Sequence, residues 1–327
     1  MKREEILNRL GFKVPDSKKK RVIVHSDVAC EADDHFAIAH HLMTPSEIIV
    51  GIIAGHFEYC NRTIPEFAQQ RFTSTEKSFA EGRKILDIME IDDIPLIRGA
   101  KQEIADRDNL PESPGADFII EEALKDDERP LYIALQGCLT DLAIALIKEP
   151  QIADKMTAIW IGGGGYPDGK GDFNMMQDVL AAQIVFESNI PLWQIPASVY
   201  SGMNITLAEL VTKVKPCGAI GEYLVNQMLD FNDAMGKRTG YGTFPYGETW
   251  AVGDQPTVSV LLQGSGVWHN EYVTVTDDMI YSKSSSGREI RVYDEIDRRM
   301  TMEDFFAKLE LCYCGRRTSD FNRDSGR

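Results

Sequence analysis

Short apolar runs alternate along the chain with longer stretches in which apolar residues recur at helical spacing. A continuous apolar run of roughly 4–8 residues indicates a strand that is covered on both faces. We expect such strands at 21–24, 48–54, 131–135, 156–161 and 191–195. The remaining patterns predict helices at 34–43, 76–89, 141–148, 179–186 and 302–309, and two further strands near 271–275 and 289–293.

Alternation of strands and helices along a chain is typical of a mostly parallel sheet with helices on both faces. The predicted fold class is therefore α/β, with an open, mostly parallel or mixed sheet of the Rossmann-like kind. Neither an internal repeat nor a low-complexity linker interrupts the pattern. We expect a single domain over residues 1–327, with a core at about 21–310 and short extensions at both ends.

Composition narrows the function classes. Of the 327 residues, 43% are hydrophobic, which excludes a disordered chain. The 35 Lys and Arg against 51 Asp and Glu leave a net charge of −16. Because nucleic-acid binding needs a clustered positive surface, this balance argues against nucleic acid as the main partner and favours a cation-binding site.

The sequence also bears on location. No apolar segment approaches the roughly 20 residues of a membrane span, and the first residues lack the apolar run of a signal peptide. The six cysteines form no Cys-x-x-Cys pair. We therefore expect reduced thiols in a cytoplasmic protein without a membrane partner. Pairing or metal binding by Cys312 and Cys314 under oxidation stays open.

Carboxylates crowd the segment that follows the first predicted strand: Asp27, Glu31, Asp33 and Asp34. Such close like charges raise one another's pKa unless a positive charge joins them. A divalent cation such as Ca²⁺, which takes 6–8 oxygen ligands, would offset the repulsion. In parallel sheets ligands bind outside the carboxyl ends of the strands, which favours a metal site here. The alternative is a surface loop in which Asp33 or Asp34 caps the next helix.

The stretch from Arg21 to Ala39 resembles the opening of the nucleoside hydrolase (inosine–uridine nucleoside N-ribohydrolase) family. That opening has an Asp-x-Asp and then two adjacent aspartates before a helix. Asp27 matches the second aspartate and Asp33-Asp34 match the pair, whereas His25 replaces the first aspartate.

More distant segments resemble the family in the same order. Gln136 to Ala143 is similar to its Gly-x-Leu-Thr-Asn turn, and Trp160 to Gly164 to its Met-Gly-Gly strand end. Asp172-Phe173-Asn174, followed by Asp178, is similar to its Glu-Phe-Asn motif, and Gly253 to Pro256 is similar to its late His-Asp motif. The matches span about residues 21–262 and imply the family's Rossmann-like fold.

The resemblance implies a Ca²⁺ site made by Asp27, Asp34, the carbonyl of Gln136, and Asp254. It implies that Asp27 takes a proton from a metal-bound water, which then attacks the anomeric carbon of a riboside. It also implies a small-molecule riboside as the partner and a homo-oligomer.

Ribose hydroxyls would be bound by Asp33, Asp172 and Asn174, since a buried carboxylate accepts several hydrogen bonds. Asp172 stands where the family has the longer Glu. Asn174 is also a candidate catalytic residue, its alternative role being a helix cap. Glu31 either orients a metal ligand or is merely exposed.

The chain departs from the family where the leaving group binds. Gly253 replaces a His that assists the base or leaving group, and Tyr166 replaces an Asn. Another expected Asn falls near Glu58. Candidates for contacting the aglycone are Glu58, Tyr166 and Trp250, with His56 as a third candidate catalytic residue. The alternative is core or loop packing for Tyr166 and Trp250, and a satisfied surface position for His56. His269 is a weaker candidate, and His35, His40 and His41 are expected on a helix surface.

Three functions fit. The first is Ca²⁺-dependent hydrolysis of the N-glycosidic bond of a ribonucleoside or related riboside. The second is a non-catalytic or repurposed ribose or nucleoside binder on the same fold, since fold alone does not imply function. The third is a phosphatase with an aspartyl nucleophile at Asp27, but Ala29 stands where such enzymes need a second acid.

Overall fold

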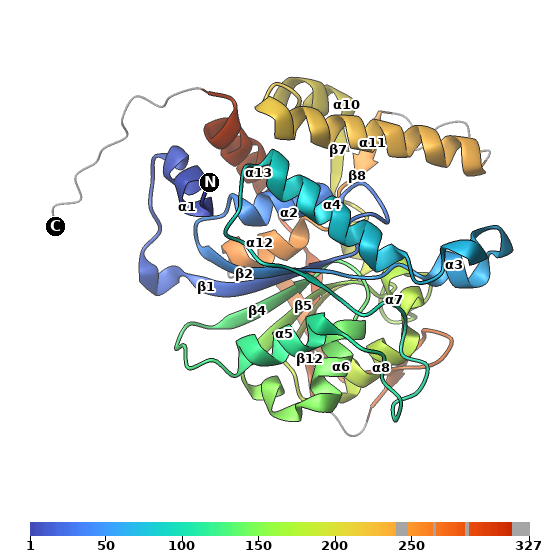
Figure 1. Ribbon diagram of the computed structural model, residues 1–327. Coiled ribbons are helices and arrows are strands. Elements are labelled where there is room, and N and C mark those ends of the chain that lie inside the picture. Colours follow the sequence, from blue (N-terminus) through green and yellow to red (C-terminus); the bar gives the residue numbers. More distant parts are fainter. Residues whose placement is uncertain (240–247, 264–265, 285–287, 316–327) are drawn as a thin grey trace.

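The computed structural model describes residues 1–239, 248–263, 266–284 and 288–315. Its centre is an eight-stranded sheet in the order β3-β2-β1-β4-β5-β6-β12-β9 (Figure 1). Among these strands every neighbouring pair is parallel except β12 and β9. The strands are β1 (Lys20–Ser26), β2 (Glu47–Ala54), β3 (Leu96–Arg98), β4 (Leu131–Leu135), β5 (Met156–Ile161), β6 (Leu192–Ile195), β9 (Val267–Glu271) and β12 (Ile290–Glu295).

Helices cover both faces of the sheet, and an apolar cluster lies under each layer (Figure 1). One layer holds α2 (Asp34–Leu42), α4 (Ser74–Ile88), α11 (Gly218–Thr239), α12 (Pro256–Gln263) and α13 (Arg298–Tyr313). The other holds α5 (Pro114–Ala123), α6 (Thr140–Lys148) and α8 (Val179–Glu187). The predicted α/β class with a mixed, mostly parallel sheet is therefore confirmed.

Smaller elements complete the described chain. Two short antiparallel pairs, β7 with β8 and β10 with β11, lie outside the main sheet. These elements are α1 (Arg3–Leu7), α3 (Tyr59–Thr63), α7 (Phe173–Gln177), α9 (Ala197–Tyr200), α10 (Leu207–Glu209), β7 (Asn204–Thr206), β8 (Thr249–Ala251), β10 (Val273–Val275) and β11 (Tyr281–Lys283). None of the described helices is long and apolar enough to cross a membrane.

The sheet brings distant loops to one edge. Asp27 follows β1, Gln136 follows β4, and Gly162 follows β5. Because these three strands are parallel neighbours, their carboxyl ends meet side by side. The main chain joins the first two ends directly, since the amide of Gln136 donates to the carbonyl of His25 at 2.8 Å.

The surface placement predicted for the histidines of α2 is wrong. His35, His40 and His41 are all buried, because α2 lies between the sheet and the helices α12 and α13. His40 pairs with Gln255 at 2.6 Å and with Asp304 at 2.8 Å. The helix has no solvent-facing side at these positions. The polar partners of the rings offset the cost of burying them.

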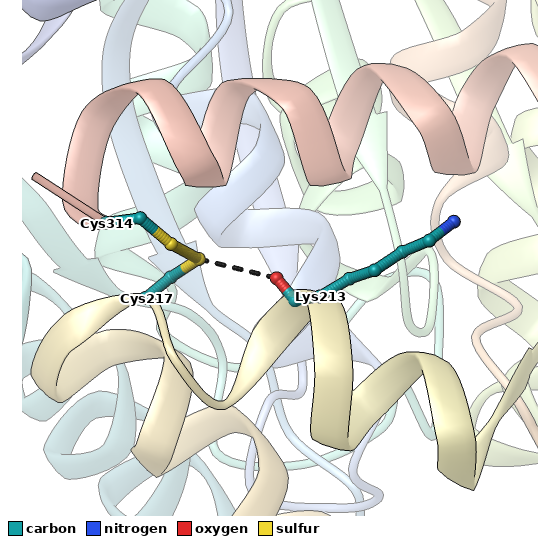
Figure 2. The surroundings of a disulfide bond; sticks show 3 residues. All are labelled: Lys213, Cys217 and Cys314. Atoms are coloured by element: carbon teal, nitrogen blue, oxygen red, sulfur yellow. Dashed lines mark hydrogen bonds between the residues drawn. A yellow bond between two sulfur atoms is a disulfide. The ribbon is translucent and has the colours of Figure 1, made fainter. Parts of the chain in front are cut away.

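The expectation of reduced thiols throughout is also wrong. Cys217, just before α11, forms a disulfide with Cys314 at the end of α13 (Figure 2). The sulfur of Cys217 lies 3.3 Å from the carbonyl oxygen of Lys213 (Figure 2). Cys312 stays a free, buried thiol, so the alternative pair within Cys312-Tyr-Cys314 does not form. The packing of α13 against the turn before α11 selects the distant partner.

Candidate active site

An acidic cavity of about 130 Å³ lies at the carboxyl edge of the sheet. The loops that follow β1 and β4 and the end of β5 meet there with the start of α7, the end of α9 and the loop before α12. Its lining consists of Asp27, Cys30, Glu31, Asp33, Asp34, Gln136, Ile161, Phe173, Asn174, Tyr200, Gly253 and Asp254. Six residues predicted as site residues therefore come together: Asp27, Asp33, Asp34, Gln136, Asn174 and Asp254.

Asp27 is held at the floor of this cavity by close backbone packing. It is 3% exposed, and its carbonyl accepts from the amide of Cys30 at 2.7 Å. A Cβ atom at Gly137 would lie 2.7 Å from Asp27 Oδ1, closer than real Cβ contacts allow. The glycine after Gln136 therefore leaves the space that the Asp27 carboxylate occupies.

Three further carboxylates gather above it. Asp33, Asp34 and Asp254 each offer an oxygen, and these three atoms lie within 4.8 Å of one another. Asp34 accepts from the hydroxyl of Ser26 at 2.5 Å, and Asp33 accepts from the amide of Gly253 at 2.8 Å. The first bond ties the start of α2 to the end of β1, and the second fixes the loop after β1 against the loop before α12.

The electrostatics of this cluster are unfavourable without a cation. Burial raises the pKa of Asp27, Asp34 and Asp254 well above the usual range, and the neighbouring carboxylates raise them further. Oxygen donors this close and this acidic fit a hard divalent cation such as Ca²⁺. Since these carboxylates lie in the buried wall of a cavity, the alternative of a solvated surface loop does not hold.

Glu31 lies at the mouth of the cavity with its side chain exposed. Desolvation in these crowded surroundings, with the charges of Asp33 and Asp172, raises its pKa to about 7. Glu31 was expected either to orient a metal ligand or to be exposed, and its position supports exposure.

Asn174 joins the ends of two strands. Its side-chain amide donates to the carbonyl of Ile161 at 2.9 Å and to that of Gln136 at 3.4 Å. It does not cap α7, because Asp172 does so by accepting from the amide of Met175 at 2.7 Å. Asn174 is therefore placed by the sheet, with its side chain in the cavity wall.

Asp172 is buried and does not line the cavity. Besides capping α7, its carboxylate accepts from the hydroxyl of Tyr200 at 2.6 Å. Burial raises its pKa, which the bonds from Tyr200 and the backbone partly offset. The shorter Asp at this position therefore does not reach the cavity itself. It holds the hydroxyl of Tyr200, whose ring lines the cavity.

Tyr200 is a cavity residue that the sequence did not single out. Its ring packs against Gly253, where a Cβ atom would lie 3.0 Å from Tyr200 Cδ2. The ring therefore occupies space beside the position where the family has a His. Cys30, Ile161 and Phe173 are further lining residues that the predicted motifs contained without a role.

Two predicted aglycone residues lie away from the cavity because other polar groups hold them. His56 is fully buried and pairs with Thr140 at 2.8 Å, and burial lowers its pKa to about 4. Glu58 is fully buried too, accepting from Phe72 and Ser74 in the loop that leads into α4.

Tyr166 and Trp250 do not line the cavity either. The Tyr166 hydroxyl donates to Gln194 at 2.8 Å, and its ring stacks on Tyr281 with centroids 4.2 Å apart. Trp250 is 3% exposed and packs against Phe231 in the core. Packing, the alternative weighed for both rings, is what their positions support. His269 lies on β9, paired with Asp294.

His25 and Asp141 depart from the family pattern together and contact each other. His25 Nε2 pairs with Asp141 Oδ2 at 2.8 Å, both side chains being fully buried. Although burial alone would raise it, the hydrogen bonds from His25, Ser113 and Ala100 lower the pKa of Asp141. A buried imidazole–carboxylate pair thus stands directly behind the strand end that carries Asp27.

A family model for inosine-uridine preferring nucleoside hydrolases matches residues 67–304. The chain belongs to this family. Among curated family members, the pyrimidine-specific ribonucleoside hydrolase RihA of Salmonella paratyphi A is 27% identical over 203 residues. That alignment covers 51% of this chain and 63% of the relative, so the chain matches less than two thirds of the relative's length.

Solved structures of the family share the fold. A plant nucleoside hydrolase, PpNRh1, superposes with a TM-score of 0.68 at 17% identity, covering 90% of this chain and 99% of the other. The purine-preferring ribonucleoside hydrolase of Gardnerella vaginalis gives 0.66 at 19% identity with the same coverage. At these identities the likeness establishes the architecture alone.

Proposed function

We propose that this protein hydrolyses the N-glycosidic bond of a ribonucleoside or related riboside in a Ca²⁺-dependent reaction. The observation that carries the proposal is the meeting of Asp27, Asp33, Asp34 and Asp254 in one cavity at the carboxyl edge of the sheet. Family membership supports the reaction class.

The proposed Ca²⁺ ligands are Asp27, Asp34, the carbonyl of Gln136, and Asp254. The clustering of Asp34 and Asp254 oxygens within 4.8 Å supports the site, and Asp33 joins the same cluster. Carboxylate and carbonyl oxygens are the donors that Ca²⁺ prefers. Bound there, the ion would offset the carboxylate repulsion and make a water more acidic.

Asp27 is the proposed general base. Its carboxylate lines the cavity beside the proposed ion, where it would accept a proton from the water that attacks the anomeric carbon. Asp33 and Asn174, both in the cavity wall, would hold ribose hydroxyls. Tyr200, in the cavity wall, would face the sugar. Asp172 positions the Tyr200 hydroxyl by accepting its hydrogen bond at 2.6 Å. The surrounding carboxylates would stabilise the oxocarbenium-like transition state.

Release of free ribose from inosine, uridine and other ribosides tests this function. We expect turnover with Ca²⁺ and none after chelation. Asp27→Asn should lower kcat by about 10²–10⁴-fold, the usual contribution of general base catalysis. Asp108→Asn, a matched change at an exposed aspartate, should leave turnover unchanged. Full activity of Asp27→Asn would refute the mechanism.

A ribose or nucleoside binder without turnover is the second candidate. It is favoured by the absence of any His among the described residues that line the cavity. Saturable riboside binding with no ribose release across the panel would support it. Ca²⁺-dependent turnover lost in Asp254→Ala would exclude it.

A further inference from the structure

A second cavity, of about 210 Å³, adjoins the acidic one. The two share Cys30, Glu31 and Phe173 as lining residues, so they lie on either side of, or beside, the same three side chains. A riboside whose sugar occupies the acidic cavity would extend its aglycone into the second. Its walls therefore decide which aglycone is accepted.

The walls of this second cavity are aromatic and sulfur-rich. Rings come from Phe57, Phe67 and Phe231 together with Phe173, and sulfur from Cys60 and Met235 as well as Cys30. Such surfaces accept flat rings on their faces.

Few polar edges are available in these walls. The Asn61 amide donates to Glu58 at 3.3 Å and to the carbonyl of Gln70 at 3.2 Å. The Gln70 side-chain oxygen accepts from Lys77 at 2.7 Å. The Asn61 nitrogen and the Gln70 oxygen thus already have protein partners. Besides these two amides, the described walls offer only Glu31 and two thiols to the edge of a nucleobase.

The charge of the two cavities together is negative. Among the described residues that line either cavity there is no Lys, Arg or His, whereas Glu31 stands where the two meet. A neutral nucleobase departs as an anion unless a group protonates it, and an acidic wall disfavours that anion. A cationic aglycone has neither difficulty, because it departs as a neutral molecule.

We propose that the second cavity receives the aglycone of a cationic N-riboside of the N-ribosylpyridinium class. This inference rests on the proposed hydrolytic function and names its substrate class. The carbon–nitrogen bond at the anomeric carbon breaks with its electron pair going to the ring nitrogen, giving a neutral pyridine. Water supplies oxygen to that carbon, and its proton goes to Asp27.

Two forces favour this cation over a neutral ring of the same shape. A cation over an aromatic face gains about 0.5–2 kcal/mol, or roughly two- to thirtyfold in binding. The ionised form of Glu31 adds Coulomb attraction at the junction of the cavities, and a cation bound there would favour that form. The phenylalanine walls also exclude water, which strengthens both.

Competition binding and turnover test the inference in the Ca²⁺-loaded protein. The probes are the N-riboside of 3-carbamoylpyridinium, its uncharged dihydropyridine form of nearly the same shape, uridine and inosine. We expect the cation to bind at least about twofold more tightly than its uncharged form. We also expect its kcat/KM to exceed those of uridine and inosine.

Variants locate the preference. Glu31→Gln and Phe67→Leu should each reduce the ratio of kcat/KM for the cation to that for uridine. Glu66→Gln removes a charge from the same segment at an exposed side chain outside both cavities and should leave the ratio unchanged. Retained Ca²⁺ stabilisation of each variant shows that it is folded.

Failure of this inference differs from failure of the proposed function. Ca²⁺-dependent cleavage of uridine or inosine with no preference for the cation would overturn the inference and leave hydrolysis standing. Preferential binding of the cation without cleavage of any riboside would support the cavity assignment and refute hydrolysis. Equal binding of the charged and uncharged forms without turnover would overturn both.

Discussion

Two linked departures from the family pattern lie behind Asp27, one in β1 and one in α6. His25 stands where an Asp is expected, and Asp141 where an Asn is expected. The sequence displayed both changes, but only the 2.8 Å contact reveals that they compensate each other. Sequence motifs identify such positions well. The pairing of residues 116 positions apart depends instead on how β1 and α6 pack in the folded chain.

This pair can be tested by a double-mutant cycle. His25→Asp leaves two carboxylates facing each other, and Asp141→Asn removes the charge that His25 meets. Each single change should lower the free energy of unfolding by about 3–5 kcal/mol, the usual cost of breaking a buried pair. The double variant, which restores the family combination, should recover much of that loss in urea unfolding.

Additive losses in the double variant would mean that His25 and Asp141 are not coupled.

His56, predicted from the sequence as a catalytic candidate, has a stability role that depends on pH. Burial lowers its folded pKa to about 4 from the ordinary 6.5. Between these values the unfolded chain binds the extra proton, so stability should fall as pH drops from about 6.5 to about 4, by about 3 kcal/mol. His56→Gln should show a correspondingly shallower decline in urea unfolding across that range.

His269→Gln, at an exposed ring, is the control and should follow the wild type. An unchanged slope in His56→Gln would contradict the burial of a neutral imidazole there.

At the scale of elements, the sequence pattern was a good guide for strands buried on both faces and for helices with one apolar face. The strands β1, β2, β4, β5 and β6 and the helices α2, α4, α6, α8 and α13 coincide with the predicted runs. The edge strand β9 was not recognisable, because it is largely exposed and lacks an apolar run. The cavity residues Tyr200 and Phe231 were equally hidden, since they come from elements without a motif.

The N-terminal segment is more than the predicted short extension. The buried guanidinium of Arg3 donates to four carbonyls at the end of α2 and in the turn that follows, those of His41, Leu42, Thr44 and Glu47, at 2.7–3.0 Å. It thereby satisfies the carbonyls that a helix end leaves without partners. Ile6 and Leu10 also join the core cluster.

Arg3→Leu should therefore lower the free energy of unfolding by about 3 kcal/mol or more, because several buried carbonyls lose their donor. Lys2→Leu, at the exposed neighbour, should change it by no more than about 0.5 kcal/mol. Urea unfolding monitored by circular dichroism measures both. Equal effects of the two substitutions would show that α1 is a dispensable extension.

At the scale of the whole molecule, the disulfide closes a large loop. Cys217 and Cys314 are 97 positions apart, so the bond ties the end of α13 to the start of α11 (Figures 1 and 2). Spacing along the sequence could not select this pair, since it depends on helix packing. The homo-oligomer implied by the family resemblance stays a prediction.

Loop-closure entropy predicts that the bond stabilises the fold by up to about 4–5 kcal/mol. Adding reductant should therefore lower the wild-type Tm, whereas Cys314→Ser should have a low Tm that reductant does not change. A wild-type Tm that is the same with and without reductant would show that this bond does not contribute to stability.

The central claim is that the carboxylates of the acidic cavity form a cation site on which the proposed activity depends. Thermal unfolding of chelator-treated protein across a Ca²⁺ titration, at neutral pH, tests it most directly for the wild type and Asp34→Asn. The wild type should show a saturable rise in Tm, worth about 2.7 kcal/mol at a hundredfold excess over Kd. Asp34→Asn should lose this rise and, because carboxylate repulsion is relieved, should be at least as stable as the wild type without Ca²⁺. A flat response of the wild type, or a full Ca²⁺ response in Asp34→Asn, would contradict the claim.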